Sequence, residues 1–172
     1  MKRYLILLAT TMILCCVGFT AAQSAYLKLG EIEGESTRSG HEDWIVIDSF
    51  SHGLGQPQGI VTGATRRRAG VVIKDLVITK KVDKATPKLM ELCAKGQVVP
   101  ELELDVVTND GRLTYKVSLK NVMVTSITTK TVCDPDCMMY DEMALTYSRI
   151  TWEYWDNRGR KTEATYNVET RN

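Results

Sequence analysis

The two histidines are the first residues of this chain that could perform chemistry. Nucleophilic catalysis needs a serine or cysteine beside a histidine base and an orienting acid. His41 and His52 both lie in Gly- and Ser-rich stretches. The serines near them in the sequence are Ser36, Ser39, Ser49 and Ser51. Proximity along the chain does not make a triad, and the sequence has no Gly-x-Ser-x-Gly motif. We therefore expect loop histidines with ordinary hydrogen bonds and no enzyme activity.

The cysteines offer a disulfide more readily than a metal site. Cys133 and Cys137 are separated by the three residues Asp-Pro-Asp, a short loop that a disulfide can close, with free thiols as the alternative. The spacing also resembles half of a metal site, but the chain has only two histidines, and Cys15 and Cys16 lie in the apolar N-terminal run. Once that run is removed, no second cysteine pair completes the four ligands of a structural zinc. We expect no metal and no other cofactor. Cys93 falls on the apolar face of a predicted helix, where a small buried hydrophobe is expected.

The glycine-rich and basic stretches in the first half of the chain carry no phosphate-binding motif. Gly53-Leu54-Gly55 and residues 59–63 are glycine-rich, but no Gly-Lys-Ser/Thr sequence follows, so a flexible loop is expected. Arg66, Arg67 and Arg68 form the only dense charge run. A solvated loop and an electrostatic protein–protein contact are its two interpretations. Nucleic acid is not an expected partner, because no interleaved aromatics or wider basic face accompany the triplet.

The N-terminus has the pattern of a secretory signal peptide. Lys2 and Arg3 precede an apolar run that ends at Phe19, and small residues follow up to Ala22. Cleavage after Ala22 fits best, and cleavage after Ser24 is second. A membrane anchor is the alternative, but the run is short for a span and no further apolar segment follows.

These features predict residues 1–22 as a signal peptide and residues 23–172 as one domain that is secreted or periplasmic, with no membrane association after cleavage. A chain of 172 residues is long enough for one domain with its own core. Removing Lys2 and Arg3 takes the basic count from 22 to 20 against 21 acidic residues, so the mature protein is nearly neutral.

Most of the remaining sequence alternates with period two and predicts an all-β fold. The expected strands are residues 26–29, 44–50, 71–79, 98–107, 112–127, 142–155 and 164–168. One short helix interrupts them at about residues 87–95, with Thr86 as N-cap, Pro87 at the first helical position and Gly96 as the stop. Many strands and one flanking helix predict a small β-barrel or sandwich of about seven to nine mostly antiparallel strands.

One hairpin can be predicted to its register. With Asp110-Gly111 as a two-residue turn, Val106 faces Tyr115 and Leu104 faces Val117 on one side of the hairpin. Leu102 then faces Leu119, and on the other side Asp105 faces Lys116 and Glu101 faces Lys120 as exposed ion pairs. A slip by one residue would set apolar residues against charged ones, so the sequence selects this register.

Eight segments of the chain carry a recognisable order and spacing. They are 26–29 (YLKL), 32–36 (IEGES), 41–45 (HEDWI), 49–51 (SFS), 78–89 (ITKKVDKATPKL) leading into Gly96, 119–122 (LKNV), 142–147 (EMALTY) and 150–152 (ITW). Together they resemble the Hcp (hemolysin-coregulated-protein-like) family, the tube subunits of bacterial type VI secretion systems. The resemblance covers about residues 25–158.

The resemblance implies a homohexameric ring that stacks into a tube, carries effector proteins and is capped by a spike protein. It also implies that the stretch from Gly53 to Gly70, with Arg66 to Arg68, takes part in ring or stacking contacts. A closed ring of identical subunits needs two different matching surfaces on each subunit, so we expect exposed edge strands or apolar patches at two distinct places. The predicted signal peptide departs from the family, whose members do not need general export. A secreted monomeric recognition or adhesion domain on the same barrel is therefore the alternative.

Overall fold

Strands make up most of the described part of the chain, as the period-two pattern predicts. The computed structural model describes residues 23–56, 71–133 and 135–168. The strands are β1 (Gln23–Leu29), β2 (Ile45–Ile47), β3 (Ser49–Ser51), β4 (Leu54–Gly55), β5 (Val72–Ile73), β6 (Leu76–Lys81), β7 (Val98–Thr108), β8 (Leu113–Cys133), β9 (Cys137–Thr146), β10 (Arg149–Trp155) and β11 (Lys161–Asn167). The described part also contains one helix, α2 (Thr86–Lys95). The expected mostly antiparallel all-β fold with a single short helix is confirmed.

The main sheet closes on itself as a barrel. Its nine strands include the path β2-β1-β7-β8-β9-β6-β3. The two ends of this path are consecutive in sequence, because only Asp48 separates β2 from β3. β2 pairs with β1 and β3 pairs with β6, so this one segment joins the two ends of the sheet. Such closure removes most free edges, and the apolar faces of all these strands meet in one core.

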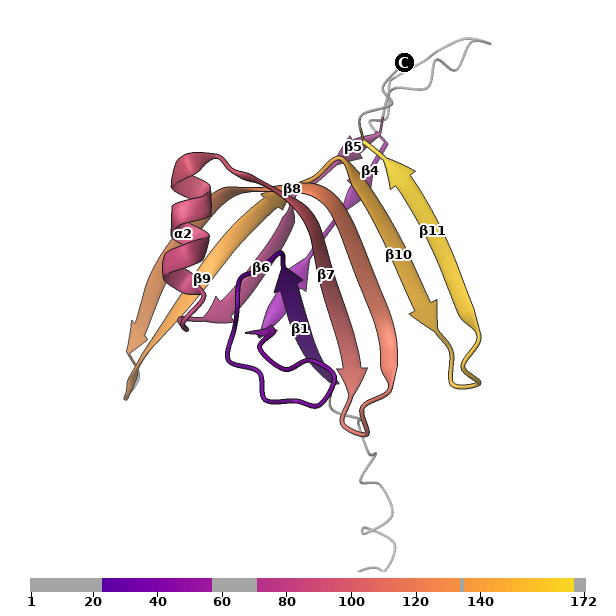
Figure 1. The fold of residues 1–172 in the computed structure, drawn as a ribbon, viewed down its shortest axis with the longest axis horizontal. Helices are drawn as coiled ribbons and strands as arrows, with labels where there is room; N and C mark the ends of the chain where they lie inside the picture. Colours follow the sequence, from indigo (N-terminus) through magenta and orange to yellow (C-terminus); the bar gives the residue numbers. More distant parts are fainter. Residues whose placement is uncertain (1–22, 57–70, 134, 169–172) are drawn as a thin grey trace, which may run out of the picture.

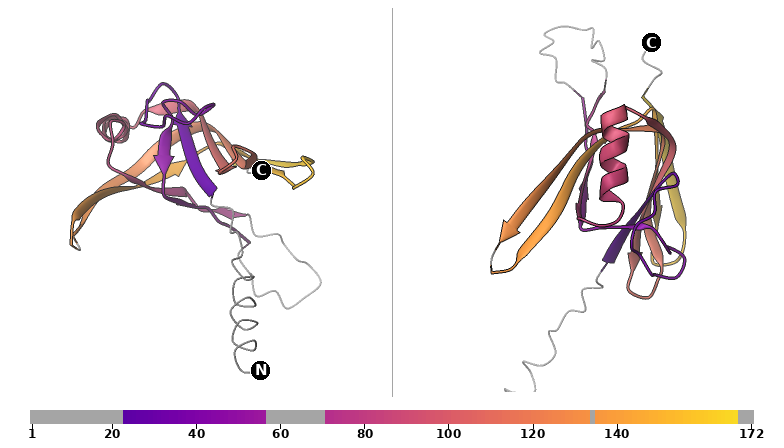
Figure 2. Two further views of the ribbon diagram at one scale, coloured as in Figure 1. Left: turned by 90° about the horizontal axis from the view of Figure 1, so that it is seen from below. Right: turned by 60° about the vertical axis from the view of Figure 1, so that its left-hand side comes forward.

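Two parts of the sheet extend beyond the barrel in opposite directions (Figure 1). The first half of β8 lies between β7 and β10, whereas its second half pairs with β9. We call the outer part of this β8–β9 hairpin, residues 128–133 and 137–142, the arm. We call the hairpin of β10 and β11 the wing. Figure 2 shows the arm projecting away from the barrel in both views.

The helix begins one residue earlier than predicted. Thr86 is the first helical residue and Ala85 occupies the N-cap position, so the prediction of Thr86 as N-cap is wrong. The Thr86 hydroxyl is used instead in a buried polar cluster described below. The stop at Gly96 is confirmed: Gly96 is left-handed, with φ 58°, and the N–H of Gln97 donates to the Leu92 carbonyl. Cys93 is a free thiol, half-buried against the core.

The predicted β7–β8 register is confirmed, but its turn is different. All five predicted pairs are present, including Val106 with Tyr115 and Asp105 with Lys116. The register shifts after Val106, however, and the N–H of Gly111 donates to the Thr108 carbonyl. The connection is therefore a three-residue loop with Gly111 left-handed at φ 88°, rather than a two-residue turn.

The remaining predicted strands are present with shifted ends. The expected strand 44–50 is divided into β2 and β3, and the expected strand 142–155 into β9 and β10. The largest difference is at the arm, where β8 continues to Cys133 and β9 begins at Cys137. Pairing between the two strands, rather than burial, extends them there, because most of the arm is exposed on both faces.

Candidate functional site

A buried polar cluster joins the base of the arm to the helix. Lys80 on β6 and Asp141 on β9 are both fully buried, and their Nζ and Oδ2 atoms lie 3.2 Å apart. The Lys80 ammonium also donates to Asp83 Oδ1 at 2.7 Å, to the Lys81 carbonyl at 2.7 Å and to Thr86 Oγ1 at 3.0 Å. A buried charge without such partners would cost several kcal/mol. The cluster therefore fixes β6, the start of α2 and β9 relative to one another.

Both carboxylate oxygens of Asp141 accept hydrogen bonds. The hydroxyls of Thr86 and Thr129 donate to its two oxygens, the latter at 2.6 Å. Burial pushes the pKa of Asp141 upward, but the hydrogen bonds from Thr129, Thr86 and Lys80 outweigh it and hold the pKa below its usual range. Asp141 is therefore charged at neutral pH. The hydrogen bond from Thr129 connects β8, the other strand of the arm, to the same cluster.

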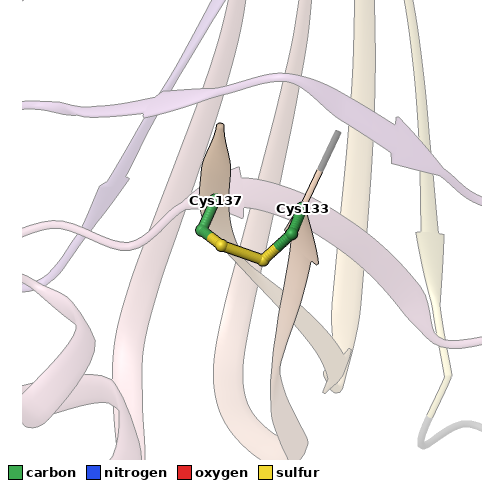
Figure 3. Close-up of a disulfide and its surroundings, with 2 residues drawn as sticks. All are labelled: Cys133 and Cys137. Atoms are coloured by element: carbon green, nitrogen blue, oxygen red, sulfur yellow. A yellow bond between two sulfur atoms is a disulfide. The ribbon is translucent and has the colours of Figure 1, made fainter. Parts of the chain in front are cut away.

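A disulfide closes the tip of the arm (Figure 3). Cys133 and Cys137 end β8 and begin β9, and they face each other in the strand register. Their sulfur atoms are 2.03 Å apart and their Cα atoms 3.9 Å apart. The adjacent register pairs are Val132 with Met138 and Thr131 with Met139. The bond therefore holds together the two strands that carry the exposed apolar residues of the arm.

The wing exposes apolar residues at the opposite end of the molecule. The face of β10 that contributes fully buried Ile150 to the core continues outward through half-buried Trp152 to Tyr154. Tyr166 on β11 lies on the same face, because it pairs with Ile150 in the register. Together with Leu54 on β4, Trp152 and Tyr166 line an open groove of about 330 Å³. Among the described strands, β11 pairs with β10 alone, so the wing also ends in an open sheet edge.

His41 packs against aromatic rings and a carboxylate on the barrel surface. Its Nε2 lies 3.0 Å from Asp105 Oδ2, and its ring stacks on Tyr26 at 5.0 Å and meets Trp44 edge-on at 4.7 Å. The other ring nitrogen, Nδ1, is buried without a hydrogen-bond partner among the described residues. A general base would need that nitrogen to be bonded to an orienting group or open to a nucleophile. By packing on Asp105, His41 shields this carboxylate from solvent. Asp105 is therefore buried, whereas a simple surface ion pair with Lys116 would leave it exposed.

His52 pairs with a tyrosine rather than with an acid. Its Nε2 is hydrogen-bonded to the Tyr147 hydroxyl, and Trp152 lies 5.9 Å from its ring. Burial lowers the pKa of His52, and burial together with the charge of Asp75 raises the pKa of Tyr147 to about 12. Both groups are therefore neutral at pH 7. Their hydrogen bond links the residue after β3 to the connection between β9 and β10.

The structure places the predicted site residues as follows. Cys133 and Cys137 lie at the arm tip, whereas Arg66, Arg67 and Arg68 lie outside the described residues. In the part of the chain that the structure describes, no group of three His, Cys, Asp or Glu side chains is arranged to hold a metal ion. Within the same part, no helix is long and apolar enough to cross a membrane.

The arm, the wing and the buried cluster were not predicted as sites. Val132 precedes the cysteine loop, and Met138 and Met139 follow it. Apolar residues on both sides of this polar loop were the signal from which the arm could have been predicted. The sequence carried no signal for the burial of Lys80. It stands next to Lys81 at the end of a predicted strand, where two lysines are expected to face solvent.

The arrangement is that of a β-barrel with two unlike projections, the arm and the wing. Residues 26–154 match the family described as "Type VI secretion system effector, Hcp", so the chain belongs to the Hcp family of type VI secretion system proteins.

Individual relatives are similar over most of the chain. The chain is 27% identical to Protein hcp1 of Pseudomonas aeruginosa over 136 residues, which cover 77% of this chain and 83% of that protein. It is 25% identical to the Major exported protein of the same organism, over 70% of this chain and 74% of that protein.

Solved structures have the same fold. A structure described as that of a type six secretion system protein has a TM-score of 0.78 at 26% identity, over 88% of this chain and 99% of that one. The crystal structure of Hcp1 from Salmonella typhimurium has a TM-score of 0.74 at 22% identity, over 86% of this chain and 96% of that one.

Proposed function

We propose that this chain is a non-enzymatic structural protein whose copies assemble into a closed homohexameric ring. The observation that carries the proposal is the presence of two unlike exposed surfaces, the arm and the wing, on opposite sides of one barrel (Figure 1). Identical subunits that join through two different surfaces form a ring when the rotation closes. Membership of a family of tube and effector proteins supports the same proposal.

By resemblance, the rings stack into tubes that carry effector proteins and meet a spike protein at the tip. Residues 66–68 would contribute a basic contact between subunits or rings. Neither nucleic acid nor a membrane is a proposed partner of the mature domain.

Sedimentation velocity of the mature domain, residues 23–172, tests the proposal. A species of about six times the protomer mass at micromolar concentration supports the ring. A single protomer at every concentration would eliminate it. Electron microscopy of the same sample then distinguishes single rings from stacked tubes.

We further propose that residues 1–22 direct export and that the domain functions in an oxidising compartment. The disulfide at the exposed arm tip favours this, because such bonds persist outside the reducing cytosol. Mass spectrometry of the exported protein should show an N-terminus at Gln23 and no free thiol at Cys133 or Cys137. An intact Met1 on the exported protein would contradict the signal peptide.

The exposed disulfide also favours a second candidate, a secreted monomeric recognition or adhesion domain on the same barrel. Such a domain would use the arm to contact a partner outside the cell without forming a ring. The sedimentation experiment separates the two candidates directly.

A further inference from the structure

The geometry points to a specific contact between copies: the apolar tip of the arm of one copy docks against the apolar face of the wing of the next. We define the tip by Val132, Met138 and Met139. We define the wing face by Trp152, Tyr154 and Tyr166 on the wing together with Leu54 on the neighbouring strand β4. The inference rests on the proposed assembly and names the two surfaces that make it.

The arm tip is apolar on both of its faces. Val132, Met138 and Met139 are 56%, 48% and 53% exposed. Paired residues of antiparallel strands share a face, so Val132 and Met138 lie on one side of the hairpin and Met139 lies with Thr131 and the disulfide on the other. A projecting hairpin in water would normally keep at least one face polar. Apolar residues on both faces suit a segment that enters a groove between two walls.

The wing offers such a groove. Leu54 and Tyr154 are each 53% exposed and Tyr166 is 38% exposed, although all three are large. Leu54 and Gly55 on β4 form one wall, and Trp152 and Tyr166 form the other. The groove is open, holds about 330 Å³ and is lined mainly by apolar atoms. Aromatic rings with flexible methionines opposite them are a favourable pairing, since the methionine side chain adapts its shape and its sulfur contacts ring edges well.

The position of the two surfaces identifies a second copy as the occupant. The arm and the wing project at opposite ends of the longest axis of the molecule (Figure 1), so the arm does not reach the wing of its own chain. Both also end in open sheet edges: the outer half of β8 pairs only with β9, and β11 only with β10, among the described strands. Copies placed head to tail would cover both apolar surfaces and both edges at once.

The disulfide controls how the tip is presented. It lies immediately beyond the Val132–Met138 pair and fixes the last rung of the hairpin. Without it, the exposed strand ends are free to separate, and the two faces of the tip no longer form one rigid unit. We therefore expect assembly to weaken when the bond is reduced.

Two complementary variants test the contact. The arm variant carries Met138→Asp and Met139→Asp, and the wing variant carries Tyr154→Glu and Tyr166→Glu. Each leaves the other surface intact. Met90→Asp is the matched control, because Met90 is a similarly exposed methionine, 40% exposed, but lies on α2. Thermal unfolding by circular dichroism verifies that all variants are folded.

Each variant alone should sediment as a protomer, with self-association weakened about 30-fold or more, as expected when the central residues of an interface are lost. An equimolar mixture should form a dimer and nothing larger, because one complete contact remains and each exposed end is blocked. The Met90→Asp control should assemble like the wild type. Reduction, or Cys133→Ser with Cys137→Ser, should weaken assembly by several-fold.

Three other outcomes would overturn the inference or the proposed function on which it rests. If the wild type forms rings and the arm and wing variants form them equally well, the arm–wing contact is wrong and the ring stands. A mixture that remains a protomer, although each folded variant has lost assembly, would show that the two surfaces do not meet. A wild type that is a protomer at every concentration would overturn the proposed function itself.

Discussion

Replacing Lys80 by methionine should destabilise the domain severely. Methionine keeps most of the length of the side chain but removes the ammonium, and with it the interactions with four partners at 2.7–3.2 Å. Asp141 then stays charged and fully buried, with only Thr86 and Thr129 to compensate it. Breaking a buried pair by removing one member costs about 3–5 kcal/mol. That is a large part of the ~5–15 kcal/mol that holds an ordinary domain folded.

Lys81→Met is the matched control, because Lys81 is the next residue on β6 and is exposed. Its replacement should change the free energy of unfolding by less than about 0.5 kcal/mol. Urea denaturation followed by circular dichroism measures both variants. The double variant Lys80→Met with Asp141→Leu should recover much of the loss, since a buried charge without a partner costs more than an apolar pair.

Two results would refute this account of the cluster. One is Lys80→Met within about 1 kcal/mol of the wild type. The other is a double variant no more stable than Lys80→Met alone, because the penalty would then not come from the charge left on Asp141. The cluster has a pH signature as well. The folded pKa of Asp141 is depressed, so its contribution is present above the unfolded pKa near 3.8 and is lost as the pH falls through the folded value.

Three further predictions concern other parts of the chain. Gly34→Ala should destabilise the domain by about 3 kcal/mol or more, because a Cβ there would lie 2.4 Å from Ile45 Cα. Gly55→Ala is the control and should be nearly neutral, since a Cβ there has nothing within 4 Å; equal unfolding midpoints of the two variants in urea would contradict this. The folded pKa of His52 is depressed below 6.5 by burial, so the stability that it contributes is present above pH 6.5 and is lost as the pH falls through the folded value. His52→Gln should flatten that part of the stability–pH curve, and an unchanged slope would be inconsistent with the assignment. Changing residues 66–68 from Arg to Glu should weaken ring formation or stacking without lowering the melting temperature; sedimentation identical to that of the wild type would leave the triplet a solvated loop.

Much of the fold followed from local patterns in the sequence. The helix end at Gly96 could be predicted because a left-handed stop is a local property of glycine. The β7–β8 register could be predicted because a slip would set Leu104 against Lys116, a penalty that is visible in the sequence alone. The resemblance to the Hcp family similarly depended on short segments whose order and spacing can be compared directly.

The errors arose where a residue had competing local and tertiary partners. Thr86 is a good N-cap by type, but its hydroxyl contacts Asp141, which is 55 residues away in sequence. Asp105 was expected on a solvated face, but the loop that carries His41 folds over it. In both cases the partner comes from a distant segment, so no local pattern could reveal it.

The sequence by itself determined the all-β class, the one helix, the hairpin register and the pairing candidates Cys133 and Cys137, because each depends on neighbours along the chain or on one strand partner. Only the tertiary structure decided which surfaces stay uncovered. The closure of the barrel through β2 and β3 buries most apolar strand faces, and it leaves those of the arm and the wing exposed. Met138 and Tyr154 stand in strands that alternate in the same way as the core strands, so the sequence does not distinguish them from core residues. They are exposed because they lie beyond the end of the barrel, and the position of that end depends on the whole sheet.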